Sequence, residues 1–303
     1  MKPLVSVVMP AYNHQRFISE AIDSVLSQSI SDIELIIVDD CSKDNTTAII
    51  KSFINQDDRI KTLFHMENLG IAKTINDGMN LAQGKYLSFI ASDDVWVKDK
   101  IEKQIEILKY DSNLIVWCEG DIIDSESNLT GEKFTVKIGG GNKNKKKSGN
   151  IFSELLKGNF IFGSSLILKR ENTKGIYYDE KYVYLNDYKY VVDLAKKYNF
   201  LFINTPLAKY RIHGQNVTQS KKEKCYEDDI LLRKYFFEQY HKEISRYSKS
   251  YLYYGISRAY DALDNKKEMR QYLYKSFVEY PLNRNTLICL IYSIYCRFRL
   301  LNK

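Results

Sequence analysis

Two adjacent carboxylates follow an apolar run in "FIASDDVW", residues 89–96. Phe89, Ile90 and Ala91 are typical of the end of a buried strand, and Asp93 and Asp94 come where the chain should leave the core. Two negative charges this close together repel each other unless a positive charge lies between or beside them. The sequence therefore predicts a positively charged partner for this pair of acids.

Two other apolar runs also end in polar residues, which are "PAYN" (residues 10–13) and "DDCSKD" (residues 39–44). The runs alternate with segments of helical periodicity, among them "IAKTINDGMNLAQG", a helix that we expect to end at Gly84. Strand–helix alternation of this kind indicates a parallel sheet with right-handed crossovers. Because ligands collect at the carboxyl ends of such strands, the three polar segments are predicted to converge on one site.

Composition limits the classes of protein that fit. The chain has 303 residues with a net charge of +7, and its apolar and charged fractions are those of a folded protein. The five cysteines show no metal-ligand or disulfide spacing, the N-terminus does not read as a signal peptide, and no apolar run is long enough to span a membrane, so we expect a cytoplasmic protein. Nucleic acid is not an expected partner, because lysines and aromatics are not grouped together, and the absence of GxGxxG after the first strand disfavours an NAD-linked enzyme.

These motifs resemble those of the family 2 glycosyltransferases, in family order over about residues 3–218. The resemblance is carried by "VSVVMPAYN", "AIDSVLSQS", "ELIIVDDCSKDNT", "NLGIAKTINDGMNLAQGKYLSFIASDDVW" and, more weakly, "YLNDYKYVVDLAKKY" and "YRIHGQNVT". It implies an α/β fold of the GT-A (Rossmann-like) type, a mixed, mostly parallel sheet flanked by helices. Residues 1–218 would form the catalytic domain and residues 219–303 a helical C-terminal extension.

The resemblance also implies a nucleotide site. Asp40 would accept a hydrogen bond from the imide N–H of uracil, since an ionised carboxylate only accepts. The alternative for Asp40 is a loop-stabilising or helix-capping acid beside Ser42 and Asp44. The other residues that the resemblance places at the nucleotide are Pro10, Ala11, Tyr12, Asn13, Asn68, Lys73, Ser92 and Asp93.

The family carries a DXD-type metal motif where this chain has "SDD". The missing positive charge would then be Mn²⁺ or Mg²⁺, held by Asp93 or Asp94 and the donor diphosphate. Many relatives have an acid where Ala91 stands, so either Asp93 contacts the ribose and Asp94 the metal, or Asp93 contacts the metal alone. His213 in "YRIH" is the third candidate ligand. The alternatives are two solvated acids that cap the next helix and a polar surface histidine.

Asp187 in "YLNDYKY" matches the family's "ED" motif, whose Asp is the usual general base, although Asn186 stands in place of the more common Glu. The alternative is an acid that stabilises the start of a helix through the helix dipole. The predicted activity is inverting, metal-dependent transfer of a hexose or N-acetylhexosamine from a nucleotide diphosphate donor, most readily a UDP-sugar, to a glycan or lipid-linked acceptor in bacterial surface polysaccharide synthesis. A non-catalytic nucleotide-sugar-binding scaffold is the alternative, favoured only by Ala91 and Asn186.

The last 18 residues, 286–303, are apolar, contain no acid and include Arg297, Arg299 and Lys303. This pattern is that of an interfacial amphipathic helix and predicts peripheral contact with the inner face of the plasma membrane. A helix packed on the catalytic domain is the alternative.

Overall fold

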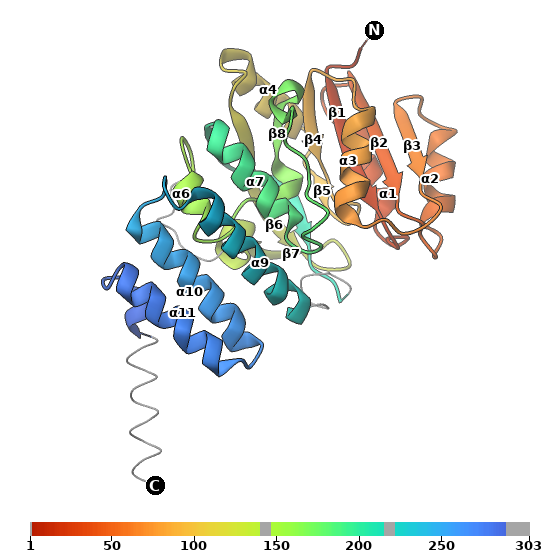
Figure 1. The fold of residues 1–303 in the computed structure, drawn as a ribbon. Helices are drawn as coiled ribbons and strands as arrows, with labels where there is room; N and C mark the ends of the chain where they lie inside the picture. The colour runs from red at the N-terminus through yellow and green to blue at the C-terminus, as the bar shows by residue number, and fades with distance from the viewer. Residues whose placement is uncertain (1, 140–146, 215–221, 289–303) are drawn as a thin grey trace. The chain divides into compact units, whose positions relative to one another are not determined.

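The chain forms a mixed sheet with flanking helices and a group of C-terminal helices (Figure 1). The computed structural model describes residues 2–139, 147–214 and 222–288. Contacts divide the chain into two units, Met1–Ile151 with Phe160–Gly214 and Phe152–Asn159 with Gln215–Lys303. The predicted boundary between residues 218 and 219 lies outside the described residues.

The first strands of the sheet are parallel, as the sequence predicts. β1 (Val5–Ala11) lies between β2 (Ile33–Asp39) and β4 (Tyr86–Phe89), and β3 (Ile60–Phe64) pairs with β2. Every residue of β1, β2 and β4 is buried, which is the pattern of parallel strands covered by helices on both faces. Since the last residue of β1 lies opposite the last residue of β2, the polar segments that follow begin side by side.

The second half of the sheet is mixed in direction. These strands are β5 (Val95–Trp96), β6 (Ile115–Ile123), β7 (Leu129–Lys133), β8 (Ile167–Lys169) and β9 (Phe200–Arg211). From β4 the order continues through β8, β6, β9 and β5, and β7 pairs with β6. β8 is antiparallel to both neighbours, whereas the long strands β6 and β9 are parallel. The predicted mixed α/β sheet is confirmed, and its longer pairings are the parallel ones.

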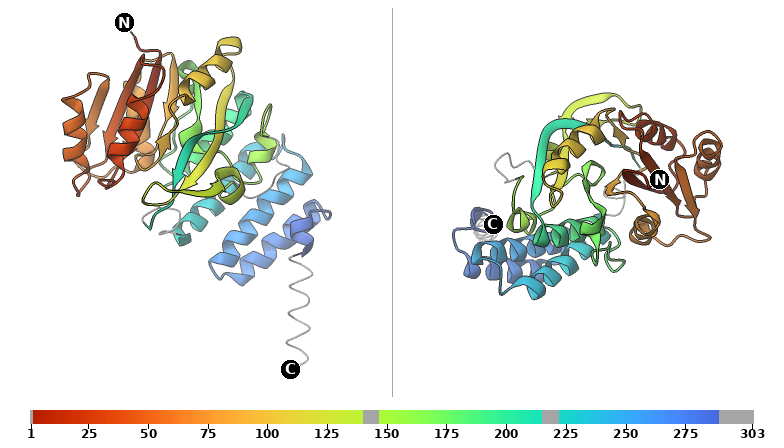
Figure 2. Two further views of the ribbon diagram at one scale, coloured as in Figure 1. Left: turned by 180° about the vertical axis from the view of Figure 1, so that it is seen from behind. Right: turned by 90° about the horizontal axis from the view of Figure 1, so that it is seen from above.

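Helices α1 (Ile18–Leu26) and α3 (Ile71–Leu81) cover opposite faces of the parallel strands (Figure 2). The buried side of α1 belongs to the same hydrophobic cluster as Val7. Helix α3 instead lies against Val8, whose side chain points to the other face because side chains alternate along a strand. Gly78 allows this approach, since a Cβ there would lie 2.5 Å from a methyl group of Val8.

Gly84 does not end α3, so that prediction was wrong. The helix ends at Leu81, and the next residue is already extended. Gly84 lies instead against β1, where its N–H donates to Ser6 Oγ at 2.8 Å. A Cβ at Gly84 would lie 2.5 Å from the backbone nitrogen of Ser6, so this position needs glycine for close backbone packing.

The remaining helices of the first unit join and flank the strands. They are α2 (Thr46–Ile54), α4 (Lys100–Tyr110), α5 (Phe134–Lys137), α7 (Asn186–Lys197) and the 3₁₀ turns Gly163–Ser165 and Arg170–Thr173. α4 buries Ile101, Ile105 and Leu108 in the hydrophobic cluster that contains α1 and the core strands. The spacing of these three residues is the helical periodicity expected of an amphipathic helix.

The second unit is helical, as predicted. It contains α6 (Phe152–Leu155), α9 (Lys222–Tyr240), α10 (Arg246–Ala262) and α11 (Lys266–Glu279). α10 packs between α9 and α11 (Figure 1). Among the described residues, none of the helices combines the length and the apolar character needed to cross a membrane. Most of the predicted amphipathic tail, residues 289–303, lies outside the described residues.

Candidate active site

The three predicted polar segments meet at the carboxyl ends of β1, β2 and β4. Asn13 N donates to Ser42 Oγ at 3.0 Å, and His14 N donates to Thr46 Oγ1 at 2.9 Å, so the first segment is joined to the second. His14 Nδ1 lies 2.7 Å from Ser92 Oγ, which joins the first segment to the third. The predicted convergence is therefore confirmed.

His14, Asp93 and His213 form a compact group at this edge of the sheet. Each offers one ligand atom, and the three atoms all lie within 4.8 Å of one another. His213 Nε2 is 3.0 Å from Asp93 Oδ2, and the rings of His14 and His213 are nearly perpendicular with centroids 5.8 Å apart. Of the predicted metal ligands, the structure thus brings Asp93 and His213 together and adds His14, which the sequence did not indicate.

Burial and neighbouring charges separate the two adjacent acids. Burial opposes ionisation of Asp93, but the hydrogen bond from His213 and the charges of His14 and His213 hold its pKa below the usual value. Burial, together with the charge of Asp93, raises the pKa of Asp94 well above its usual value. Burial also lowers the pKa of His14, which favours the neutral imidazole that a metal ligand must be. The two acids therefore do not repel each other as two ionised carboxylates would, because their surroundings favour the ionised form of Asp93 and the protonated form of Asp94.

Asp94 faces away from the group formed by His14, Asp93 and His213. Its Oδ2 accepts a hydrogen bond from Ser164 Oγ at 2.5 Å, and its Oδ1 accepts from the backbone N–H of Arg211 at 3.1 Å. Ser164 Oγ also accepts from the N–H of Ala91 at 3.0 Å. These hydrogen bonds fix the turn that carries Asp93. Asp94 therefore supports the site through buried contacts with Ser164 and Arg211.

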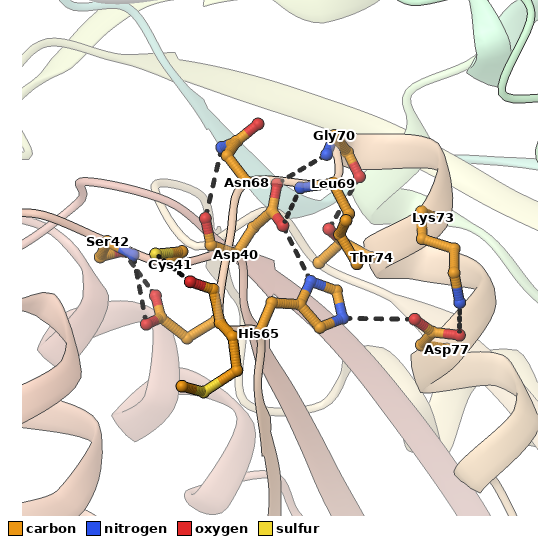
Figure 3. A network of polar contacts seen from close by, with 12 residues as sticks. Asp40, Cys41, Ser42, His65, Asn68, Leu69, Gly70, Lys73, Thr74 and Asp77 are labelled. Carbon is orange, nitrogen blue, oxygen red and sulfur yellow. Dashed lines mark hydrogen bonds and ion pairs between the residues drawn. The ribbon is translucent and has the colours of Figure 1, made fainter.

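Asp40 is buried beneath the loop that precedes α3 (Figure 3). One carboxylate oxygen accepts from Leu69 N and lies close to His65 Nδ1, both at 2.8 Å, and the other accepts from Gly70 N at 2.9 Å. Asn68 Nδ2 donates to the backbone oxygen of Asp40 at 3.3 Å. Asp40 and Asn68, both predicted at the nucleotide, therefore share one network, in which three donors already occupy the Asp40 carboxylate.

Lys73 joins the same network through Asp77. Lys73 Nζ lies 2.5 Å from Asp77 Oδ1, and Asp77 Oδ2 lies 3.2 Å from His65 Nε2 (Figure 3). His65 thus bridges Asp40 and Asp77, while the Lys73 side chain remains 39% exposed. Asp77 thus holds a partly exposed lysine in the first turn of α3.

Asp40 does stabilise a loop, but that loop is the one before α3. The contacts beside Ser42 belong to its neighbour Asp39. Asp39 accepts hydrogen bonds from Ser42 Oγ and from Thr47 Oγ1, the latter at 2.7 Å. Asp44, which precedes α2, accepts from Thr46 N at 3.0 Å. These contacts fix the loop after β2, and Asp40 takes no part in them.

The remaining predicted nucleotide residues lie along the end of β1 and the adjoining loop. Pro10 and Ala11 are buried at the end of β1, where they pair with Val38 and Asp39 of β2. Tyr12 follows directly and is 43% exposed, which leaves its ring open to a flat partner such as a nucleotide base. Asn13 has a left-handed backbone with φ of 53°, a conformation that Asn tolerates better than most residues.

We expect Asp40→Asn to lower the free energy of unfolding by about 1 to 3 kcal/mol, because an amide NH₂ would replace one oxygen that now accepts from buried donors. Urea unfolding measures this loss. Asp58→Asn is the matched control: Asp58 is exposed in the same unit, and its variant should stay within about 0.5 kcal/mol of wild type. Equal stability of both variants and wild type would contradict the network around Asp40.

Asp187 lies in the first turn of α7 and is half-buried. Burial raises the pKa of its carboxyl to about 6, although the hydrogen bond from Tyr188 N, at 2.7 Å, favours the ionised form. Tyr178 stacks on Tyr190 of α7 with ring centroids 4.2 Å apart, and both rings contact Phe89 at the end of β4. This aromatic cluster ties the helix that carries Asp187 to the strand that leads to Asp93.

Two imidazoles and one carboxylate can hold a divalent cation. Imidazole suits borderline transition metals, whereas Mg²⁺ prefers a shell made entirely of oxygens. Of the two predicted ions, the donor set of His14, Asp93 and His213 therefore fits Mn²⁺ better than Mg²⁺.

Sequence reasoning missed His14, His65 and Arg211. His14 directly follows "PAYN", and its place at a strand end was the available signal. His65 ends the third apolar run, in the same way as the acids that end the second and fourth. No local pattern marks Arg211, because its partners come from distant parts of the chain.

The arrangement of sheet and helices is found in solved glycosyltransferases. The S. aureus TarS 1–349 structure in complex with UDP-GlcNAc superposes with a TM-score of 0.62 at 16% identity, covering 92% of this chain and 81% of that one. The mannosyltransferase PcManGT from Pyrobaculum calidifontis, in complex with GDP-Man and Mn²⁺, gives a TM-score of 0.60 at 14% identity, covering 97% and 81%. The fold is the GT-A fold of glycosyltransferases.

Sequence comparison gives the family. The model of Glycosyl transferase family 2 matches residues 6–176, more than half of the chain. The chain belongs to the family 2 glycosyltransferases.

Two bacterial glycosyltransferases are among the named relatives of the chain. The putative teichuronic acid biosynthesis glycosyltransferase TuaG of Bacillus subtilis is 47% identical over 107 residues, which are 35% of this chain and only 42% of TuaG. The UDP-Glc:alpha-D-GlcNAc-diphosphoundecaprenol beta-1,3-glucosyltransferase WfgD of Escherichia coli is 30% identical over 231 residues, 75% of this chain and 85% of WfgD.

Proposed function

We propose that this glycosyltransferase is an inverting, Mn²⁺-dependent enzyme that moves a sugar from a UDP-sugar to a lipid-linked or glycan acceptor in surface polysaccharide synthesis. The observation that carries this proposal is the group of His14, Asp93 and His213 at the strand ends where the predicted nucleotide residues also meet. A divalent cation held there would neutralise the charge that builds on the departing nucleotide diphosphate.

The name of WfgD supports a UDP-sugar donor and a lipid-linked acceptor, because WfgD is similar over three quarters of this chain. That name pairs UDP-Glc with a beta linkage. UDP-glucose carries an α-linked sugar, so a β-linked product implies inversion at the anomeric carbon. The same stereochemistry is proposed here.

Asp187 would act as the general base. As the acceptor oxygen forms its bond to the anomeric carbon, that oxygen must lose its proton, and the bond from the anomeric carbon to the diphosphate breaks. A carboxylate with a pKa near 6 is ionised at neutral pH and is a stronger base than an ordinary Asp, which suits this step.

Tyr12, Asp40, Asn68 and Lys73 would form the nucleotide side of the site. Tyr12 offers an exposed ring for the base, and Lys73, whose side chain is partly exposed and paired with Asp77, offers a positive charge for the diphosphate. Asp40 has three donors on its carboxylate, and a carboxylate accepts about four hydrogen bonds, which leaves room for the imide N–H of uracil. Peripheral membrane contact through residues 286–303 stays a prediction.

Donor hydrolysis tests the proposal. UDP-glucose, UDP-GlcNAc, GDP-mannose and dTDP-glucose are each incubated with the protein and either Mn²⁺, Mg²⁺ or EDTA, and release of the nucleotide diphosphate is measured. We expect the fastest release from a UDP-sugar with Mn²⁺, slower release with Mg²⁺, and none above background with EDTA. Binding of UDP without release from any donor would instead support the non-catalytic scaffold. Equal rates with Mn²⁺ and EDTA would overturn the metal role.

A further inference from the structure

Arg211, the last residue of β9, is a buried cation at the back of the candidate metal group. Only 1% of its surface is exposed, although it is one of the largest side chains in the core. A buried charge of this size is costly unless it is paired and fully hydrogen-bonded. Its contacts therefore indicate what the fold uses it for.

The guanidinium contacts three parts of the chain outside β9. Nε donates to the backbone oxygen of Asp93 at 2.7 Å, in the turn after β4. Nη1 donates to the backbone oxygen of Asp124 at 3.1 Å and to Ser127 Oγ at 2.9 Å, in the connection from β6 to β7. Nη2 donates to Glu20 Oε2 of α1 at 2.6 Å. One planar group thus holds the Asp93 turn against two other elements.

Arg211 is also linked to His213, through the ring of Phe17. Its guanidinium carbon lies 5.0 Å from the centre of the Phe17 ring, and the ring of His213 lies 4.6 Å from the same Phe17 ring. The Phe17 ring therefore contacts both Arg211 and His213. The aromatic face limits how the His213 ring can turn, and Arg211 in turn stabilises Phe17 through a cation–π contact.

We propose that Arg211 is a positioning residue for the metal group: it fixes the Asp93 backbone directly and the His213 ring through Phe17, with Glu20 as its counter-charge. The inference rests on the proposed metal role of Asp93 and His213. It adds Arg211, Phe17 and Glu20 as residues that would act on the metal site indirectly, by holding its ligands in place. Changes to partners behind metal ligands typically cost about 10- to 100-fold in metal affinity, because they let the ligands turn away.

Arg211→Lys tests this role in the full chain. Lysine keeps the positive charge but has a single nitrogen, so it cannot hold Asp93, the β6–β7 connection and Glu20 at the same time. We expect the Mn²⁺ dissociation constant, measured by the EPR signal of free Mn²⁺, to rise by about 10- to 100-fold. Thermal unfolding is recorded in parallel. A purely structural arginine would lower Tm and leave the Mn²⁺ affinity of the folded protein unchanged, and that result would overturn the proposal.

Arg59→Lys is the matched control. Arg59 donates hydrogen bonds to Asp57 and to the backbone oxygen of Leu26, and it directly precedes β3, at the amino end of that strand. Its variant should bind Mn²⁺ as wild type does, whatever its Tm. An equal loss of affinity in both arginine variants would show a general loss of stability and would also overturn the role of Arg211.

Glu20→Gln keeps the test decisive if Arg211→Lys does not fold. The Glu20 side chain is 43% exposed, so its replacement should not prevent folding. Loss of the counter-charge should weaken Mn²⁺ binding by about 3- to 10-fold, less than the roughly 10- to 100-fold typical of such partners because the glutamine oxygen can still accept from Arg211. Unchanged affinity would overturn the proposal. Wild-type protein that binds no Mn²⁺ would overturn the proposed metal site together with this inference, whereas normal wild-type binding and unchanged variants would overturn the role of Arg211 alone.

Discussion

Asp187→Asn should lower kcat by about 10²- to 10⁴-fold, which is the usual contribution of a positioned general base. Asparagine keeps the size of the side chain and the oxygen that accepts from Tyr188 N, but it cannot take a proton from the acceptor hydroxyl. The affinity for UDP should stay close to that of wild type, because a base for the acceptor does not contact the nucleotide. Loss of kcat with normal UDP binding therefore separates a base from a metal ligand.

The same variant should be more stable than wild type at neutral pH. Burial raises the pKa of Asp187 from its usual 3.8 to about 6, so the ionised carboxylate costs stability in the folded state. That cost is fully present above pH 6, shrinks as the pH falls from 6 toward 3.8, and is absent below. Removing it should raise the free energy of unfolding by about 1 to 3 kcal/mol at pH 8, with the lower end expected because the residue is only half-buried.

Two pH profiles check these statements. The kcat of wild type should fall as the pH drops through about 6, because protonated Asp187 cannot act as a base. The stability advantage of Asp187→Asn, measured by urea unfolding, should be present at pH 8 and absent near pH 4. Asp179→Asn is the matched control, since Asp179 is a nearby acid that lies 3.6 Å from Lys189. If transfer survives in Asp187→Asn and is lost in Asp179→Asn, the base is Asp179.

The sequence predicts best those parts of the fold that are determined locally. The runs that form β1, β2 and β4 are apolar throughout because both faces of each strand are covered, and their polar ends mark the functional edge of the sheet. Placement of β8 between β4 and β6 could not be read in the same way. It depends on antiparallel pairings between residues about 80 positions apart in β4 and β8 and about 50 apart in β6 and β8, and a local periodicity in the sequence cannot indicate such pairings.

Buried charges are the second feature that local patterns hide. Lys100 is the first residue of α4 and would be expected at the surface from its charge, yet it is fully buried. Its Nζ lies 2.9 Å from Gln104 Oε1 and 3.8 Å from the centre of the Trp96 ring. Burial lowers its pKa to about 7. Arg211 can be buried because it pairs with Glu20. The two residues are 191 positions apart in the sequence, so no local pattern indicates the pair. Long-range pairing of this kind makes a charged residue tolerable inside the protein, and only the folded chain brings the partners together.

The second large effect is expected on Mn²⁺ binding, when the first of the two adjacent acids, Asp93, is replaced. Asp93→Asn should weaken Mn²⁺ binding by more than about 100-fold, because a change to a ligand itself should exceed the 10- to 100-fold cost of changes behind the ligands. The neutral amide oxygen that remains is a poorer ligand for a hard cation than a carboxylate. Binding of UDP in the presence of Mn²⁺ should fall as well, since a bound cation would bridge to the diphosphate.

Asp94→Asn is the neighbouring control. Its oxygens bond to Ser164 Oγ and to the backbone of Arg211, outside the group of His14, Asp93 and His213. Asparagine can keep both contacts, because its oxygen can accept from the backbone N–H and its NH₂ can donate to the serine hydroxyl. We therefore expect the Mn²⁺ affinity of Asp94→Asn to stay within about 3-fold of wild type, a change smaller than those typical even of partners behind the ligands.

Mn²⁺ titration followed by EPR, with and without UDP, distinguishes the arrangements that the sequence left open. Loss of Mn²⁺ binding in Asp93→Asn alone supports Asp93 as the ligand, with His14 and His213 beside it. Loss in both variants would mean that Asp94 turns toward the cation and gives up Ser164. Loss in Asp94→Asn alone would reverse the assignment and leave Asp93 for the ribose. Because the two acids are adjacent and receive the same substitution, a difference between the variants reports the different surroundings of the two carboxylates: Asp93 contacts His213, whereas Asp94 contacts Ser164 and the backbone of Arg211.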